Sequence, residues 1–359
     1  MPDKSVKVSL VGDIFPSNLV YTRKFGNGSV FLNGIDNEWV EQTKDLFSHS
    51  DIVFGNLESP LIKDEEYVNN SSFAGSEKFA SVLKNLGFDI VSVANNHILE
   101  QGFEGFLSTQ NALSNADVQS IGIFNDRKSN IEVIEKNGLK FGFAGFNAIK
   151  DIVNPNLHAD LTFENVARTL DEMNTLGLDY KILSFHWGNE YINIPSYEQI
   201  SLAHSVIDYG ADVIVGHHPH VIQPVERYKK GIIIYSLGNF LFDSPYSKQF
   251  KLGMMIELFF NKDEKIDYQA FEVKLSRDKI NSVSQSLNIH KKLNKYESQM
   301  QNLICTSKDD YIKYYKSKLR QNHQYQRILM KIHLLEMMLL SRNRRQLIKN
   351  VFDRVAGNI

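Results

Sequence analysis

The stretch Gly210-Ala-Asp212-Val-Ile-Val-Gly-His217-His218-Pro-His220 decides how this chain folds. Its glycine marks the end of a helix, an aspartate follows two residues later, a short apolar run forms a strand, and histidines stand where the strand stops. The same order of signals occurs in residues 87–97 and 177–186. Ligands of open α/β sheets bind beyond the carboxyl ends of the strands. The three stretches therefore predict a metal site at one edge of a sheet.

Strands and helices alternate along residues 6–285, and this alternation predicts a largely parallel sheet covered by helices. After residue 242 the pattern changes, and two apolar runs joined by a polar loop, 252–260 and 266–275, predict an antiparallel hairpin. The expected strands are 6–11, 52–55, 90–94, 139–145, 180–185, 213–216 and 232–237. The expected helices are 39–48, 77–86, 103–116, 165–176 and 197–209.

The chain of 359 residues carries one cysteine, Cys305, which excludes an intrachain disulfide framework and a zinc site built from several cysteines. Ligands for a metal must then come from His, Asp, Glu and Asn, a set that suits Zn, Mn, Fe or Mg. Residues 2–7 lack the apolar segment of a signal peptide, and no run of about 18 apolar residues is present. We therefore expect a cytoplasmic protein without a membrane-spanning helix.

Charge divides the chain into two parts, which we expect to be a domain of residues 1–285 and a basic, mainly helical extension of residues 286–359. The extension holds 15 Lys and Arg against 5 Asp and Glu, whereas residues 1–285 hold 25 against 37. This asymmetry is typical of a tail that contacts an anionic surface, although docking on the acidic body explains it equally well. The apolar run 328–340 is followed by arginines. It fits a helix on the inner face of a membrane, or one that packs on a neighbouring domain or a second subunit.

Metal-capable side chains follow five of the expected strands. In extended backbone His218 and His220 point the same way, so both can reach one metal, whereas His217 points away and is expected behind the ligands or in the core. Two divalent ions about 3.5–4 Å apart need a bridging oxygen ligand and nitrogen donors on each side, and the inventory suffices for one ion or two. The candidate ligands at these strand ends are Asp13, Asn56, Glu58, Asn96, His186, His218 and His220.

Other function classes lack their motifs. The chain has no GxxxxGK[ST] phosphate loop, no GxGxxG after a strand and no GxSxG elbow. Its aromatic residues are scattered and form no evident stacking platform for nucleic acid. We therefore expect a metal-dependent protein without a nucleic-acid partner.

Six motifs follow one another along residues 6–275: Gly12-Asp13, Asn56-Leu-Glu58, Ala94-Asn-Asn-His97, His186-Trp-Gly188 with Glu190, Gly216-His-His-Pro-His-Val221 and Tyr235-Ser-Leu-Gly-Asn-Phe240. Together they resemble the CapA-type capsule-synthesis family, which takes its name from poly-γ-glutamate capsule production. That family is related to the calcineurin-like metallophosphoesterases. The resemblance implies an α/β fold, a four-layer α/β/β/α sandwich of metallophosphoesterase type, followed here by the C-terminal helical extension.

The resemblance also implies roles for the motif residues. His186 and His218 would hold one metal and His220 the other, with Asp13 and Asn96 as further ligands. His97 would donate a proton to the leaving group and would form the catalytic pair with Asn96. From the same motifs we expect four residues to bind substrate: Asn95, Trp187, Glu190 and Asn239.

Two departures from the phosphoesterase pattern concern the metals. The histidine that pattern places two residues after its first aspartate is replaced by Phe15, so one metal position is short of a nitrogen ligand. The bridging aspartate is also missing, and either Asn56 or Glu58 must take its place. These departures favour weaker binding, a single ion or a different metal selectivity.

The resemblance implies a protein of capsule or envelope polymer biosynthesis that hydrolyses a phosphate ester on a sugar or polymer with one or two divalent ions. Two alternatives stay open. The first is a polymer-binding scaffold subunit of a capsule synthase, which Phe15 favours. The second is a metal-dependent hydrolase or transferase acting on amide bonds of poly-γ-glutamate. The expected partners are an anionic phosphorylated or polymeric substrate, other capsule-synthesis proteins and, through the basic extension, a membrane surface.

Overall fold

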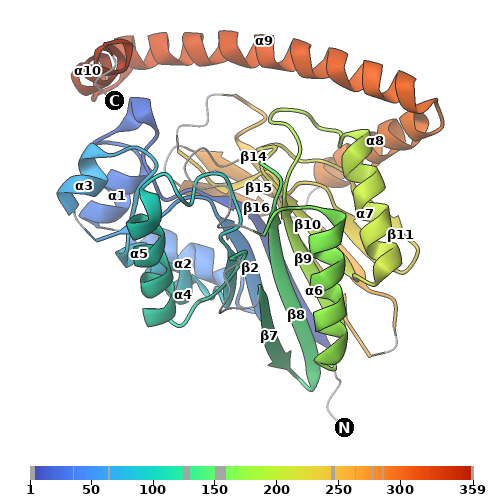
Figure 1. The fold of residues 1–359 in the computed structure, drawn as a ribbon. Helices are drawn as coiled ribbons and strands as arrows, with labels where there is room; N and C mark the ends of the chain where they lie inside the picture. The colour runs from blue at the N-terminus through green and yellow to red at the C-terminus, as the bar shows by residue number, and fades with distance from the viewer. Residues whose placement is uncertain are drawn as a thin grey trace.

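A computed structural model describes residues 5–34, 36–63, 65–123, 130–149, 159–243, 247–262, 264–276, 279–284 and 287–356, and most of its strands form two sheets (Figure 1). The candidate site lies where parallel strands of the two sheets end. The first sheet contains, in spatial order, β16 (Lys279–Ser284), β15 (Asp267–Ser276), β14 (Leu252–Phe260), β1 (Val6–Ile14), β2 (Ile52–Leu57), β5 (Ile90–Ser92) and β6 (Gln119–Ile121), with β13 (Asn239–Leu241) paired to the end of β1.

The second sheet has a parallel centre and antiparallel edges. It contains, in spatial order, β11 (Val225–Tyr228), β12 (Gly231–Ile234), β10 (Val213–His217), β9 (Tyr180–His186), β8 (Leu139–Asn147) and β7 (Ile131–Lys136). Two short strands, β3 (Leu61–Ile62) and β4 (Gly75–Ser76), pair separately.

Helices cover the outer face of each sheet. The first sheet is flanked by η1 (Val20–Thr22), α1 (Asn27–Asn33), α2 (Asn37–Asp45), α3 (Glu65–Asn70), α4 (Lys78–Leu86) and α5 (Gly102–Asn115). The second sheet is covered by α6 (Phe163–Thr175) and α7 (Tyr197–Tyr209), and the chain ends with α8 (Leu287–Ile304), α9 (Lys308–Leu340) and α10 (Arg344–Val355).

Three apolar layers hold these parts together. Trp39, Phe79 and Phe106 pack the first helices on their sheet, and Phe54 and Phe143 pack the two sheets on each other. A third cluster, which includes Leu170, Phe185 and Ile207, packs α6 and α7 on the second sheet. The four-layer α/β/β/α sandwich predicted from the resemblance is therefore confirmed, with a helical C-terminal region.

The aspartates of the repeated Gly-x-Asp signal align neighbouring strands. Asp89 accepts a hydrogen bond from the Val53 main-chain nitrogen at 2.9 Å, and Asp179 accepts one from Lys140 at 2.8 Å. Asp212 accepts the same kind of bond from Lys181 at 2.9 Å. Each carboxylate thus fixes the start of its own strand against the next one, at the end of the sheet opposite the histidines. These three aspartates are therefore structural residues of the strand starts and not metal ligands.

Several details differ from the expectations. The strands divide between two sheets, so a single largely parallel sheet is wrong. The predicted hairpin is present as β14 and β15, and it extends the first sheet with antiparallel strands. Strands β6, β7 and β11 were not expected, because each is short or half-exposed and lacks a continuous apolar run. The boundary expected at residue 285 lies outside the described residues.

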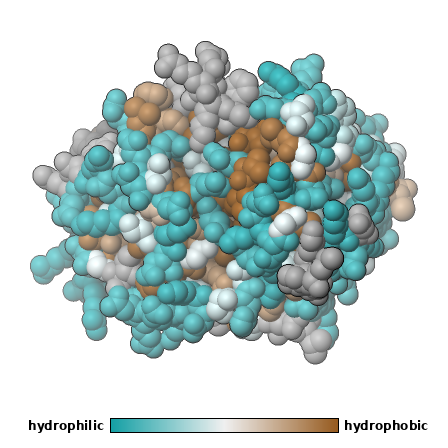
Figure 2. Space-filling view, turned by 90° about the horizontal axis from the view of Figure 1, so that it is seen from below, coloured by the Kyte–Doolittle hydropathy of each residue, from teal (hydrophilic) through white to brown (hydrophobic). Residues whose placement is uncertain are grey.

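The C-terminal helices α9 and α10 lie along one side of the sandwich, at the top of Figure 1. The opposite side, seen from below, is mainly hydrophilic, with apolar side chains gathered near its centre (Figure 2). Within the described ranges, no helix is both long and apolar enough to cross a bilayer.

Candidate metal centre

The two sheets bring the predicted ligands together where their parallel strands end. Asp13 lies near the end of β1 and Glu58 directly after β2, while His186 closes β9 in the other sheet. His218 and His220 follow β10. All five side chains are buried.

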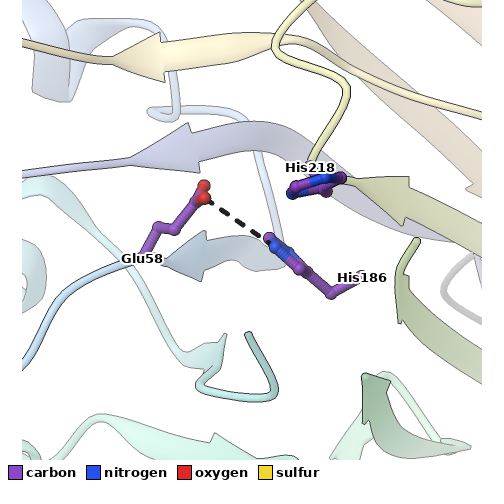
Figure 3. Close-up of side chains that lie close together, drawn as sticks. All are labelled: Glu58, His186 and His218. Carbon is purple, nitrogen blue, oxygen red and sulfur yellow. Dashed lines mark ion pairs between the residues drawn. The ribbon is translucent and has the colours of Figure 1, made fainter. Parts of the chain in front are cut away.

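Three overlapping groups of these residues have the spacing of metal ligands. They are Glu58 with His186 and His218, Glu190 with His218 and His220, and Asp13 with Glu58 and His220. Within each group the candidate ligand atoms lie within 4.8 Å of one another. Figure 3 shows the first group, with Glu58 and His186 directed toward each other beside His218.

Glu58 lies at the centre of the site and carries an unsatisfied oxygen. Its Oε1 atom is 3.8 Å from His186 Nε2 and 3.7 Å from His220 Nε2, and it is buried without a hydrogen-bond partner. Nδ1 of His218 is also buried without a partner. Buried polar atoms are nearly always paired, and metal coordination would satisfy both of these. The residues present therefore fit a divalent cation.

The protonation states of the ligands support this fit. Burial, followed by the electrostatic interaction with the His218 ring, lowers the pKa of His186 well below its ordinary value. Burial and the charge of His220 lower the pKa of His218 to about 4. Both rings are thus neutral at physiological pH, the state in which imidazole binds a metal.

His220 supplies a positive charge at the position where a metal would. Burial alone would lower its pKa, but the carboxylates of Glu58 and Asp13 raise it to about 10. Burial, followed by the charge of Asp13, raises the pKa of Glu58 well above its ordinary value. Two buried carboxylates and a charged imidazole are the arrangement expected of a cation site in its metal-free form.

Asp13 is held from two sides. Burial would raise its pKa, but His217 and His220 hold that pKa well below its ordinary value. His217 Nδ1 lies 3.2 Å from Asp13 Oδ1, and His220 Nδ1 lies 3.3 Å from Asp13 Oδ2. His217 thus lies directly behind a candidate ligand, which agrees with its expected place behind the metal site.

The His218–His220 turn is not extended, so the predicted alternation of its side-chain directions is wrong. His218 has a φ of 92° and His220 a φ of 55°, values in the left-handed region that non-glycine residues rarely adopt. Both rings still reach the site, where their centres lie 5.9 Å apart. Strained backbone of this kind persists where the surrounding structure fixes it, most often at functional sites.

Asn56 and Asn95 hold the ligands by hydrogen bonds. The Asn56 side-chain nitrogen donates to Asp13 Oδ1 at 2.9 Å, and its oxygen accepts from Asn95 at 3.2 Å. Asn95 also donates to the Leu57 main-chain oxygen at 2.8 Å. The Asn56 amide therefore turns its nitrogen toward the carboxylates, which leaves Glu58 as the better placed of the two candidates for a bridging ligand. Asn95 is fully buried, so the structure does not place it in contact with substrate.

A polar chain leads from His186 toward the surface. His186 Nε2 lies 2.8 Å from Asn96 Oδ1, and the Asn96 side-chain nitrogen lies 3.1 Å from His97 Nε2. On its other side, His97 Nδ1 lies 3.0 Å from the Glu100 carboxylate. The structure thus brings the predicted catalytic pair to the edge of the ligand cluster, with His97 partly open to solvent.

Phe15 fills the position of the missing histidine with an aromatic cluster. It stacks on Phe242 at 5.0 Å and meets Phe73 edge-on at 5.6 Å, while Phe73 stacks on His97 at 4.6 Å. Because Phe15 is fully buried in this cluster, it supports His97 and offers no ligand.

Glu190 was expected to bind substrate, but the structure places it within reach of His218 and His220. Burial would raise its pKa, yet His220 and a hydrogen bond with Tyr191 lower it, so the carboxylate is ionised. Glu190 can therefore supply a ligand where Phe15 supplies none. The sequence signal that could have identified Glu190 as a ligand is its place as a metal-capable acid four residues after His186.

The remaining two predicted substrate residues lie behind the site. Trp187 is 1 % exposed, packs in the apolar layer under α7, and donates its indole N–H to the Tyr235 main-chain oxygen at 3.0 Å. Side chains alternate along a strand, so Trp187 points away from the face that His186 occupies. A substrate contact by Trp187 is therefore wrong. The Asn239 oxygen lies 2.9 Å from His220 Nδ1, so Asn239 orients that ring and is itself buried.

Comparison with known proteins identifies related sequences. A family model described as "Bacterial capsule synthesis protein PGA_cap" matches residues 7–244. "Capsule biosynthesis protein CapA" of Bacillus anthracis is 32% identical over 265 residues, covering 68% of this chain and 62% of that protein. "PGA biosynthesis protein CapA" of Bacillus subtilis is also 32% identical, over 68% of this chain and 66% of that protein. The chain thus spans somewhat less than two thirds of the length of these relatives.

Two of the solved structures that match the chain are distant likenesses. A sulfate thiohydrolase SoxB from Thermus thermophilus matches with a TM-score of 0.45 and 10% identity, over 83% of this chain and 61% of that one. A 5'-nucleotidase from Candida albicans matches with a TM-score of 0.43 and 10% identity, over 88% of this chain and 58% of that one. Likenesses this distant say nothing about the activity of the chain.

Proposed function

This chain belongs to the PGA_cap family of bacterial capsule synthesis proteins, and we propose that it serves capsule or poly-γ-glutamate synthesis as a metal-dependent phosphoesterase. The single observation that carries the catalytic part is the convergence of Asp13, Glu58, Glu190 and three histidines around the unpaired Glu58 Oε1. These residues would hold one or two divalent ions, and Mn, Zn, Fe and Mg are the metals that suit the donor set.

The proposed substrate is a phosphate ester on a sugar or on an anionic polymer. Bound divalent ions supply Lewis-acid stabilisation of a phosphoryl oxygen and lower the pKa of water. His97 stands at the open edge of the site, where it can protonate the leaving oxygen. The Glu100 carboxylate orients that ring through Nδ1 and leaves Nε2 facing Asn96.

A phosphoester screen tests the catalytic proposal. Purified protein would be loaded separately with Mn, Zn, Fe or Mg and assayed on sugar phosphates, nucleotides and diesters, with poly-γ-glutamate included to detect amide cleavage. We expect phosphoester turnover that disappears after chelation and in His218→Asn. The matched control is His49→Asn, because His49 is an exposed histidine after α2. Amide cleavage without phosphoester turnover would support the amide-bond alternative.

A polymer-binding scaffold is the second candidate, and Phe15 is the observation that favours it. Phe15 removes a nitrogen ligand, so the site can hold an anionic polymer through its cations without hydrolysing it. Binding of poly-γ-glutamate with no turnover under any of the four metals would support this candidate over the enzyme.

The basic C-terminal region suggests a contact with anionic lipid through α10. Phe352 and Val355 are exposed on this helix, beside the exposed Arg344, Arg345 and Lys349. Co-sedimentation with phosphatidylglycerol vesicles should fall in Arg344→Glu/Arg345→Glu and persist in Lys313→Glu/Lys316→Glu, a matched charge change on α9. Equal binding by both variants would contradict this contact. Other capsule-synthesis proteins remain proposed partners.

A further inference from the structure

Helix α9 carries an apolar stripe that no described part of the chain covers. Five large apolar side chains on this helix are 47–72 % exposed, while its other described large apolar residues are buried or half-buried. The intervals between the five are 3, 4, 3 and 4 residues, which is the spacing of positions a and d in a coiled-coil heptad. The stripe consists of Tyr325, Ile328, Ile332, Leu335 and Leu339.

Other residues of α9 fix the helix to the body of the protein. Tyr311 donates a hydrogen bond to the Pro195 main-chain oxygen at 2.8 Å, and Asn322 donates one to the Tyr191 main-chain oxygen at 2.9 Å. Gln326 is buried and donates to Gln249 at 3.2 Å. The exposure of the five side chains shows that the stripe faces away from the body. Helix α9 itself runs along the top of the molecule (Figure 1). A helix that is already formed and anchored loses little conformational entropy when a partner binds.

The charges beside the stripe specify the orientation of a partner helix. With Tyr325 at position a, Lys331 occupies g and Glu336 occupies e of the following heptad. In a parallel pair of identical helices, each g residue lies beside the e residue of the next heptad on the other helix. Lys331 would thus meet Glu336 of a second copy twice by symmetry. An antiparallel pair would instead bring g beside g and e beside e, which places like charges together.

A lipid surface fits this stripe less well. A helix on an anionic membrane has a broad apolar face bordered by Lys and Arg, whereas a stripe confined to a and d is the narrower seam of a coiled coil. Glu336 borders the stripe on one side and would be repelled by anionic lipid.

We propose that α9 pairs with α9 of a second copy of this chain as a short parallel coiled coil along Tyr325–Leu339. The paired segment lies outside residues 7–244, so it is separate from the part matched by the family and from the metal centre. The bodies of the two copies would lie on opposite sides of the pair, because each body lies behind its own α9.

Site-directed crosslinking tests both the partner and the orientation. The natural Cys305 is exposed, so Cys305→Ser provides a background without thiols. In that background Leu335→Cys should form a disulfide-linked dimer under mild oxidation, because d residues of a parallel pair face their own counterparts. Arg327→Cys is the matched control, since it is exposed in the same helix but lies off the stripe. Equal crosslinking of the two variants would overturn the proposal.

The oligomeric state of the full chain gives an independent test. Wild-type protein should sediment as a concentration-dependent dimer, and Ile332→Glu/Leu335→Glu should raise the dissociation constant at least about tenfold. Lys316→Glu/Arg327→Glu, with charge changes off the stripe, should dimerise as wild type does. Lys331→Glu should weaken the dimer, and adding Glu336→Lys should restore it. The altered residues are exposed, so folding should be retained, which circular dichroism would check.

Wild-type protein that stays monomeric at every concentration would contradict the dimer. Loss of binding to phosphatidylglycerol vesicles by Ile332→Glu/Leu335→Glu in such a monomer would assign the stripe to a membrane.

Discussion

Asn322 of α9 donates a hydrogen bond to the main-chain oxygen of Tyr191 at 2.9 Å, and Tyr191 is the residue after Glu190. On the other side of Glu190, the Asn189 side chain donates to the Tyr315 hydroxyl at 3.2 Å. Helix α9 therefore holds both neighbours of a carboxylate that lies within reach of His218 and His220. A segment outside the matched family region contributes in this way to the geometry of the candidate metal centre.

Removing this support should weaken metal binding. We expect Asn322→Ala to lower the affinity for Mn or Zn by up to about tenfold, because one hydrogen bond contributes about 0.5–1.5 kcal/mol. Isothermal titration calorimetry measures the affinity. Asn302→Ala removes an exposed asparagine from α8 and should leave the affinity unchanged. Equal affinities in all three proteins would show that α9 does not position Glu190.

His97 should act in turnover and not in metal retention. We expect His97→Gln to keep its metal content while kcat falls by about 10²–10⁴, the range for losing a general acid. Glu100→Gln should have a smaller effect, because it only removes the partner of His97 Nδ1. Loss of metal together with activity in His97→Gln would make His97 a ligand.

Glu58 should destabilise the metal-free protein. Its pKa is raised by burial, so its ionised form opposes folding above its ordinary pKa, and that penalty is present at neutral pH. We expect Glu58→Gln to raise the free energy of unfolding of chelated protein by about 1–3 kcal/mol, because the direction of the pKa shift indicates that the burial cost of the carboxylate exceeds its attraction to the charged His220. Metal ions should stabilise wild type and not the variant, as thermal unfolding with and without metal would show. Lower stability of chelated Glu58→Gln would mean that the carboxylate is already compensated.

Acid should weaken the metal-free protein through His218. Its pKa falls from about 6.5 unfolded to about 4 folded, so the unfolded state binds the proton first and stability drops as pH falls below about 6.5. Between pH 7 and 5 the loss should be about 2 kcal/mol larger in wild type than in His218→Gln. Urea unfolding of chelated protein at both pH values measures this loss of stability. The raised pKa of Glu58 acts in the opposite direction in both proteins, so the difference between them isolates His218. Identical losses would contradict a buried, neutral His218.

Much of the fold could be predicted from local signals. Gly87, Gly177 and Gly210 each end or follow a helix with positive φ, and the aspartate two residues later starts a strand, as the sequence indicates. The division into two sheets could not be read from these signals, because strands of both sheets carry the same apolar runs. It followed only from the resemblance to a known family.

The sequence predicts which residues belong to the candidate site better than it predicts how they are arranged. Strand ends gave Asp13, Glu58, His186 and the His218–His220 turn. The place of Glu190 depends on a turn with positive φ at Gly188 and on contacts with α9, more than 120 residues later in the chain. The position of Trp187, by contrast, could be predicted from the sequence, because strand alternation from His186 already indicates that Trp187 points into the core.

The metal content of the purified protein tests the central claim most directly. Wild type, Glu58→Gln/His220→Gln and the control His49→Asn would be incubated with Mn, Zn, Fe or Mg, dialysed and analysed by atomic emission. We expect one or two ions per chain in wild type and in His49→Asn, and none in the double variant. Wild type that retains no ion under any of these conditions, or a double variant that retains as much as wild type, would contradict a metal centre built on Glu58 and His220.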